Sequence, residues 1–169
     1  MSSRRDKLGI NATFKNNDPV EIARKLRLSD GIGFLARVLS AKANLLFQQL
    51  TKQDDITPRQ FGALLTLHQK GALTLTELAR ELRVDRSTLG EMMRRMTIEG
   101  LVSRSENAED LRSYRVAITP IGRKVLLSLV SGAAQLQDAL LECIPPHQRR
   151  DFYQALKAFA ATSQDAGDT

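Results

Sequence analysis

One stretch of the chain places several side chains that bind polar ligands on a single face of a predicted helix, residues 86–99. At about 100° per residue, four apolar side chains share one side of this helix and the opposite side is polar. The apolar side holds Leu89, Met92, Met93 and Met96. The polar side holds Arg86, Ser87, Thr88, Gly90, Glu91, Arg94 and Arg95. Hydroxyls, guanidiniums and a carboxylate can bond to DNA base edges and phosphates, although the solvated face of an ordinary amphipathic helix has the same composition.

A basic hairpin follows that helix. We expect strands at residues 101–104 and 114–118, joined by a loop whose tip carries Asp110 and Arg112. Asp110 is expected to orient the guanidinium of Arg112, which can then enter a narrow minor groove. Arg104, on the first strand, is expected to contact DNA as well. An exposed loop with a local ion pair is the plainer interpretation.

Capping patterns predict the elements that hold these side chains in place. Thr74 and Glu77 form a capping-box pattern that begins a short helix ending at Leu82, and Gly100 ends the helix over residues 86–99. Two helices joined by a short turn, with an arginine-tipped hairpin beside them, are suited to reading one groove of DNA while contacting the next.

The rest of the chain is predicted to be helical, so the fold class is mainly α. Helix starts are marked by Asp18-Pro19, Ser29 or Asp30, Thr57-Pro58 and Thr119-Pro120, and Pro145-Pro146 separates the last two helices. The long helices near the two ends are apolar and lie outside the central unit. We therefore expect a helical bundle shared by two protomers, with a closed monomeric bundle as the alternative.

Net charge is weaker support for DNA binding than the kind of cation. The formal net charge is +6, but residues 1–28, with seven basic and three acidic side chains, contribute +4, so residues 29–169 carry +2. Between Arg83 and Arg115 there are seven arginines and no lysine. Arginine binds guanine edges and phosphates in a forked geometry. Tryptophan is absent and aromatic residues make up 5%, which argues against stacking on exposed bases.

The residues needed for catalysis are scarce. Two histidines, one cysteine and no glycine-rich phosphate loop leave little for nucleophilic, metal or cofactor chemistry, so we expect no enzyme, metal site or cofactor. The single cysteine, Cys143, is expected to be a buried structural residue rather than a redox sensor. No apolar run approaches about 18 residues and the first residues lack a signal-peptide core, which predicts a cytoplasmic protein.

The run LTLTELARELRVDRSTLGEMMRRMTIEGLVSRSENAEDLRSYRVAITPIGRKVL resembles the winged helix-turn-helix of MarR-type transcriptional regulators. The resemblance covers about residues 30–162, and its most specific parts are the EGLVSR and ITPIGR segments and the Asp110-x-Arg112 wing. It implies that Arg86–Glu99 corresponds to the DNA-reading helix, Arg112 to the wing arginine and Asp110 to its partner. The chain departs from many members in its longer N-terminal extension and in an Asp-Leu-Arg wing, which has one cation fewer than Asp-Arg-Arg.

The resemblance implies a homodimer that binds a pseudo-palindromic double-stranded operator and represses transcription until a small effector releases it, with no membrane partner. The expected fold is a winged helix-turn-helix with a two-stranded wing and long N- and C-terminal helices forming a dimerisation bundle. The expected boundaries are 1–28 for a basic extension, 29–56 for a dimerisation helix, 57–118 for the DNA-binding domain and 119–169 for C-terminal dimerisation helices. A winged-helix protein–protein adaptor without specific DNA binding is the alternative. DNA binding should weaken steeply between about 50 and 200 mM salt, whereas adaptor binding to an apolar groove should not.

The family's effector cleft lies where the winged domain meets the dimerisation helices, which in this chain implies Phe34, Arg37, Phe61 and His68. Aromatic faces and a cation suit an aromatic acid or its thioester. Core packing is the plainer interpretation of the two phenylalanines. The plainer interpretation of His68 is a residue near a helix C-terminus.

Overall fold

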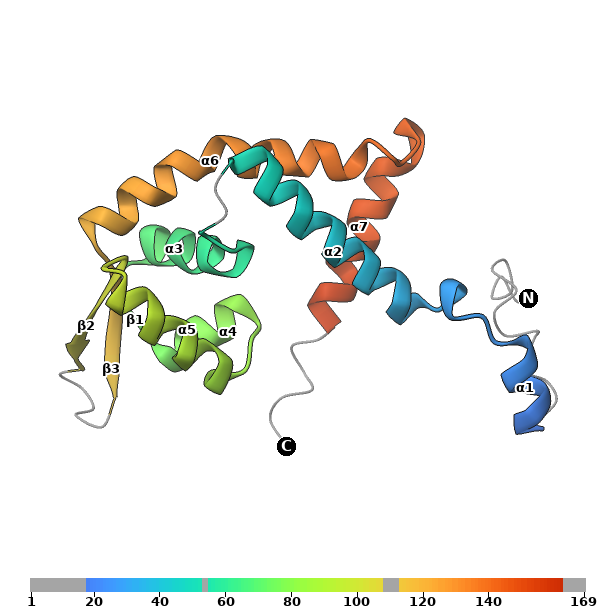
Figure 1. The fold of residues 1–169 in the computed structure, drawn as a ribbon, viewed down its shortest axis with the longest axis horizontal. Helices are drawn as coiled ribbons and strands as arrows, with labels where there is room; N and C mark the ends of the chain where they lie inside the picture. The colour runs from blue at the N-terminus through green and yellow to red at the C-terminus, as the bar shows by residue number, and fades with distance from the viewer. Residues whose placement is uncertain (1–17, 53–54, 108–112, 163–169) are drawn as a thin grey trace, which may run out of the picture. The chain divides into compact units, whose positions relative to one another are not determined.

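The computed structural model describes residues 18–52, 55–107 and 113–162, which belong to two compact units divided between Lys42 and Ala43 (Figure 1). In chain order the elements are α1 (Pro19–Lys25), the 3-10 helix η2 (Leu28–Asp30), α2 (Ile32–Thr51), α3 (Pro58–Lys70), β1 (Leu73–Thr74), α4 (Leu75–Leu82), α5 (Arg86–Ile98), β2 (Val102–Glu106), β3 (Tyr114–Ile118), α6 (Pro120–Leu141) and α7 (Pro146–Thr162). The boundary between the units falls inside α2. The mainly helical prediction is confirmed.

The first unit contains α1, η2 and the beginning of α2. The carboxylate of Asp18 accepts a hydrogen bond of 3.0 Å from a backbone N–H in the first turn of α1, and Pro19 takes the first helical position, as predicted. The predicted cap of the next helix at Ser29 or Asp30 is wrong. Both residues lie inside η2, and α2 begins only at Ile32, because an extended glycine separates the two helices.

In the second unit, α3, α4 and α5 pack against one another and against the strands, and α6 runs along α3 (Figure 1). Their apolar faces form one core, in which the largest fully buried side chains include Leu64, Leu67, Leu78, Leu89, Met93, Met96, Leu126 and Leu129. Thr74 and Glu77 form the predicted capping box at the start of α4, with both reciprocal bonds present. The helix α5, which has one polar side, packs its other side into this core.

The predicted two-stranded wing is present as the hairpin of β2 and β3, and the sheet contains a third strand, β1, that was not predicted. The strands lie in the order β1-β3-β2, and all pairs are antiparallel. The added strand β1 pairs Leu73 with Val116 and Thr74 with Arg115. A two-residue strand has no alternating pattern of its own. Its pairing depends on residues more than 40 positions away, so only the tertiary structure reveals it.

The start of α6 fixes the hairpin relative to the end of α5. Thr119 caps α6 by accepting from the Gly122 N–H at 3.0 Å, and its hydroxyl donates to the Gly100 carbonyl at 2.6 Å. A Cβ at Gly122 would lie 2.0 Å from the Leu101 carbonyl oxygen, so only glycine allows this approach. The β2–β3 hairpin is therefore held against the C-terminal end of α5.

The helices that flank the winged region expose large apolar side chains. No described residue of α7 is buried, and its apolar residues Leu156 and Phe159 are 41% and 71% exposed. The helix α6 buries Leu126 and Leu129 but exposes Leu127 at 61%. Among the described residues, no helix is both long and apolar enough to cross a membrane.

The prediction that Cys143 is buried is wrong for the single chain. The helix α6 ends at Leu141, and Cys143 lies in the exposed turn before α7. Its thiol approaches the Leu140 carbonyl at 3.5 Å. The proline pair that ends α6 also carries the thiol out of the apolar face, because the residues after Leu141 no longer follow the helical period.

Candidate DNA-binding surface

A short turn joins α4 to α5 and sets their relative orientation. Arg83, the C-cap of α4, adopts a left-handed conformation with φ 53° and ψ 46°. The next N–H, of Val84, donates back to the Ala79 carbonyl at 3.2 Å, which closes the end of α4. Asp85 then caps α5. The three residues 83–85 thus complete the predicted helix-turn-helix.

The two faces of α5 separate as predicted. Leu89, Met92, Met93 and Met96 are all at most 7% exposed. The exposed side chains are those of Arg86, Ser87, Thr88, Glu91, Arg94 and Arg95, whereas Gly90 is half-buried. A Cβ at Gly90 would meet the Leu75 side chain at 3.7 Å, an ordinary contact, so packing alone does not require glycine at this position.

Asp85 organises the N-terminal end of α5. One carboxylate oxygen accepts from the Thr88 N–H at 2.7 Å and from the Ser87 hydroxyl at 2.6 Å. The bond from Ser87 contributes most to lowering the pKa of Asp85, and with the bond from Thr88 it holds this pKa well below its usual value. Ser87 is a predicted DNA contact. In the free protein its hydroxyl donates a hydrogen bond to the capping carboxylate of Asp85.

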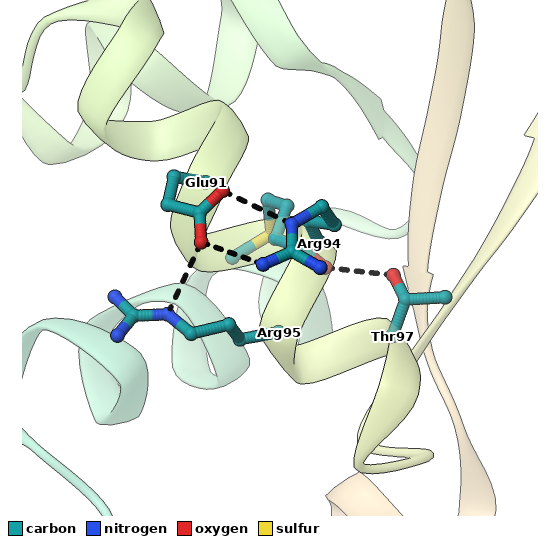
Figure 2. A network of polar contacts seen from close by, with 5 residues as sticks. Glu91, Arg94, Arg95 and Thr97 are labelled. Atoms are coloured by element: carbon teal, nitrogen blue, oxygen red, sulfur yellow. Dashed lines mark hydrogen bonds and ion pairs between the residues drawn. The ribbon is translucent and has the colours of Figure 1, made fainter.

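Glu91 binds the two arginines of the next turn (Figure 2). Arg94 donates to both carboxylate oxygens, from Nε at 3.0 Å and from Nη2 at 2.9 Å. The Nε of Arg95 lies 4.0 Å from one of the same oxygens. The bond from Arg94 lowers the pKa of Glu91 and raises that of Arg94. All three side chains are exposed, so this network contributes little stability and its guanidiniums can exchange the carboxylate for another acceptor.

Among the described residues of the wing, one arginine is exposed. Arg104 is exposed on β2, and its guanidinium lies over the ring of Tyr114 on β3, 4.6 Å from the centroid. The two residues are diagonal neighbours across the hairpin, because Arg104 pairs with Val116. Asp110 and Arg112, the predicted wing tip, lie outside the described residues.

The base of the wing is closed by a pair of residues that sequence reasoning missed. Asn107 is only 5% exposed, and its side-chain amide donates to the Ser113 hydroxyl at 2.8 Å. Its backbone N–H donates to the Ser113 carbonyl at 3.3 Å. These bonds hold the two points at which the segment 108–112 leaves and rejoins the hairpin. The available sequence signal was an asparagine in the predicted loop, a residue type that often bonds nearby backbone.

The predicted effector residues have identifiable neighbours in their own units. In the first unit, the guanidinium of Arg37 lies over the ring of Phe34, 5.8 Å from its centroid. In the second, Phe61 packs against Phe47 with ring centroids 5.5 Å apart, which agrees with its plainer role in packing. His68 is exposed, and its Nδ1 lies 3.2 Å from the guanidinium of Arg123. A guanidinium can only donate, so Nδ1 is the acceptor in this contact.

The chain is similar to transcriptional regulators. Residues 56–114 match the model of the MarR family. The chain is 31% identical over 97 residues to the organic hydroperoxide resistance transcriptional regulator of Bacillus subtilis, an alignment that covers 57% of this chain and 66% of that protein. The match therefore spans just under two thirds of the relative's length.

Solved structures share the fold. The structure of a mutant MarR from Escherichia coli complexed with operator DNA superimposes with a TM-score of 0.68 at 25% identity, covering 76% of this chain and 92% of that one. The structure of Bordetella bronchiseptica BpsR gives a TM-score of 0.73 at 24% identity, covering 80% and 96%. These relatives are regulators of transcription and not enzymes. Together with the helix-turn-helix, the exposed face of α5 and the wing, these similarities identify residues 56–114 as a winged helix-turn-helix of the MarR family of transcriptional regulators.

Proposed function

We propose that this chain is a homodimeric repressor that binds a pseudo-palindromic DNA operator in the cytoplasm and is released by a small effector. The observation that carries the proposal is the division of α5, which buries four apolar side chains and exposes hydroxyls and guanidiniums, with Arg104 exposed on β2, a strand that packs against α5. A helix of this kind, fixed by a helix-turn-helix, enters the major groove with its N-terminal residues against base edges.

The free protein holds part of its DNA-binding surface in internal bonds. Arg94 is paired with Glu91, and the Ser87 hydroxyl is donated to Asp85. On DNA, Arg94 exchanges the exposed carboxylate for guanine or phosphate acceptors, while Glu91 keeps its contact with Arg95 or accepts from cytosine. The remaining contacts are assigned to Arg86, Thr88, Gly90, Arg104 and Arg112, with Asp110 orienting Arg112.

The dimer follows from the apolar residues that a single chain leaves exposed outside the winged domain. They occur on α2, α6 and α7, in the segments 29–56 and 119–169 that we assign to dimerisation. Two-fold symmetry then places two α5 helices about one turn of DNA apart. A monomer presents only one such helix and would lose most of its affinity for a palindrome.

The effector is proposed to be a small aromatic or anionic molecule, such as an aromatic acid or its thioester. DNA binding by BpsR, a structural neighbour, is regulated by 6-hydroxynicotinic acid, which is a molecule of that class. Phe34, Arg37, Phe61 and His68 are the proposed contacts. An effector that binds more tightly to a dimer geometry with the wrong helix spacing would shift the population away from DNA.

In vitro selection from a pool of random DNA duplexes tests the DNA-binding role. The expected result is an enriched pseudo-palindrome with half-sites about one helical turn apart, bound with an affinity that falls steeply as salt rises. An absence of enrichment, together with salt-independent binding to a protein partner, would favour the adaptor function. No described contact favours that alternative.

A further inference from the structure

The base of the wing carries a buried polar side chain outside the apolar core. Asn107 follows the last residue of β2 and is only 5% exposed. Its side-chain amide donates to the Ser113 hydroxyl at 2.8 Å, and its backbone N–H donates to the Ser113 carbonyl at 3.3 Å. A buried amide loses its hydrogen bonds to water, so protein groups must replace them. We refer to these two bonds as the Asn107–Ser113 clasp.

The clasp extends the hairpin beyond its regular ladder. The ladder between β2 and β3 ends at the pair of Glu106 and Tyr114, and Asn107 and Ser113 are the next residues along the chain on either side. Without the clasp, the connection between the strands would lengthen by one residue at each end. A longer connection has more conformations available to it, so its side chains are held less well in any one position.

The clasp acts on one of the two arginines that the wing contributes to the proposed DNA surface. Arg104 lies within the ladder, opposite Val116, and its guanidinium lies over the Tyr114 ring. Its position is therefore fixed without the clasp. Arg112, which lies outside the described residues, belongs to the segment that connects the two clasped residues.

We propose that Asn107 is a positioning residue of the DNA-binding surface, which contacts no DNA itself but holds, through Ser113, both ends of the segment that carries Arg112. Fixing these ends restricts the segment before DNA binds, so less conformational entropy is lost when Arg112 enters its groove. The effect on DNA affinity rests on the proposed function, whereas the clasp itself can be tested without DNA.

Four variants separate the clasp from other effects. Asn107→Ala and Ser113→Ala each remove one partner of the side-chain bond, whereas Ser113→Thr keeps the hydroxyl. Ser105→Ala is the matched control, because Ser105 is exposed on β2 and its hydroxyl bonds to no residue that the structure describes. Thermal unfolding checks that each variant is folded, and if Asn107→Ala is not, the two Ser113 variants still decide.

Gel-shift titration of the full-length protein with its selected operator measures the effect on DNA. Asn107→Ala and Ser113→Ala should each weaken binding about five-fold, whereas Ser113→Thr and Ser105→Ala should stay within about two-fold of the wild type. The salt dependence of binding by Asn107→Ala should become shallower, towards that of Arg112→Ala, since each lost phosphate contact lowers the slope by about 0.9.

Double variants distinguish positioning of Arg112 from a general weakening of the domain. In the Arg112→Ala background, Asn107→Ala should cause no further loss of operator affinity, because the side chain that it positions is already gone. In the Arg94→Ala background it should cause its full loss, because Arg94 is fixed on α5. A general loss of stability would have the same effect in both backgrounds.

Hydrogen exchange of the backbone amides tests the clasp in the absence of DNA. The Asn107 amide should exchange about ten-fold faster in Ser113→Ala than in the wild type, while the amide of the buried Val116 should be unchanged. Ser113→Thr should restore the slower exchange at Asn107.

Native operator affinity in both Asn107→Ala and Ser113→Ala would overturn the proposal. Losses that add fully to that of Arg112→Ala would also overturn it, because Asn107 would then act elsewhere. A wild-type protein that binds no DNA duplex would refute the proposed function instead, and the exchange rate of the Asn107 amide would still decide whether the clasp forms.

Discussion

The winged domain buries most of its large apolar side chains, whereas the flanking helices leave many of theirs exposed. Within residues 57–118, Ile98 is the one large apolar side chain exposed among those the structure describes. The helices α2, α6 and α7 expose many, including Leu35, Val38, Leu45, Leu127, Val130, Tyr153, Leu156 and Phe159. Contiguous exposed apolar residues mark surfaces that another molecule covers.

The difference indicates that the two regions have different roles. The winged domain buries its apolar side chains in one core, to which α6 contributes Leu126 and Leu129, and leaves the polar side of α5 exposed. The other apolar side chains of the flanking helices are exposed in the single chain, which is the expected state of half an interface. A second copy of this chain is the partner we propose, and the following predictions test or refine that contrast.

The largest effect is expected from charges on the exposed stripe of α7. The double variant Leu156→Asp and Phe159→Asp should convert the dimer to monomer at micromolar concentration, because each of these side chains contributes about 1.5–3 kcal/mol when buried. Sedimentation velocity measures the change. Gln154→Asp, on the same helix, should remain dimeric. A double variant that stays dimeric would remove α7 from the interface.

A core change in the winged domain should act on folding instead. Met93 is fully buried, so Met93→Ala should lower the free energy of unfolding by about 2–5 kcal/mol. Urea denaturation followed by circular dichroism measures it. Ile98→Ala, an apolar truncation on the same helix at an exposed site, should change stability by less than about 0.5 kcal/mol. Similar losses in both variants would contradict the described core.

DNA contacts should be separable from both folding and dimerisation. Arg94→Ala and Arg112→Ala should each weaken operator binding about ten-fold or more at fixed salt, while the dimer and the melting temperature remain unchanged. Gel-shift titration measures the affinity. Lys157→Ala on α7 is the control, since it removes a cation outside the winged domain. Native affinity in both arginine variants would refute the roles assigned to α5 and the wing.

The N-cap of α5 should give the winged domain a small acid-sensitive increment of stability. The pKa of Asp85 is lower in the folded state than the usual 3.8, so the unfolded chain binds the proton first as the pH falls. The contribution is complete above about pH 4 and is lost below it. Asp85→Ala should lower the melting temperature by a few degrees at pH 7, and the gap should narrow as the pH falls below 4. Asp85→Asn should retain most of the stability at neutral pH, because asparagine also caps helices.

The smallest effect is expected from the carboxylate that holds Arg94. Glu91→Gln leaves the shape of α5 unchanged but frees both guanidiniums of the network, so affinity for random-sequence DNA should rise a few-fold. The salt dependence of that binding should become steeper. Fluorescence anisotropy with a non-operator duplex measures both. A loss of affinity would mean that Glu91 itself contacts DNA.

The successes of sequence reasoning share a physical cause. The capping box at Thr74 and the stop at Gly100 are local, since each depends on bonds within a few residues. The buried face of α5 follows from helical periodicity, which a single sequence displays directly. The bidentate pair of Glu91 and Arg94 has i,i+3 spacing, so it also lies within one turn of the helix.

Two kinds of feature were missed. Strand β1 depends on pairing with β3, a distant part of the chain. The exposure of Cys143 is local, because α6 ends at Leu141, before the cysteine.

By itself, the sequence determined most of the helices and their caps, the polar face of α5 and the resemblance to the family, because these depend on short-range spacing and on residue type. Only the tertiary structure decided the third strand and the bonds between Asn107 and Ser113. Both depend on which strands and strand ends meet in space, and one-dimensional spacing does not encode that.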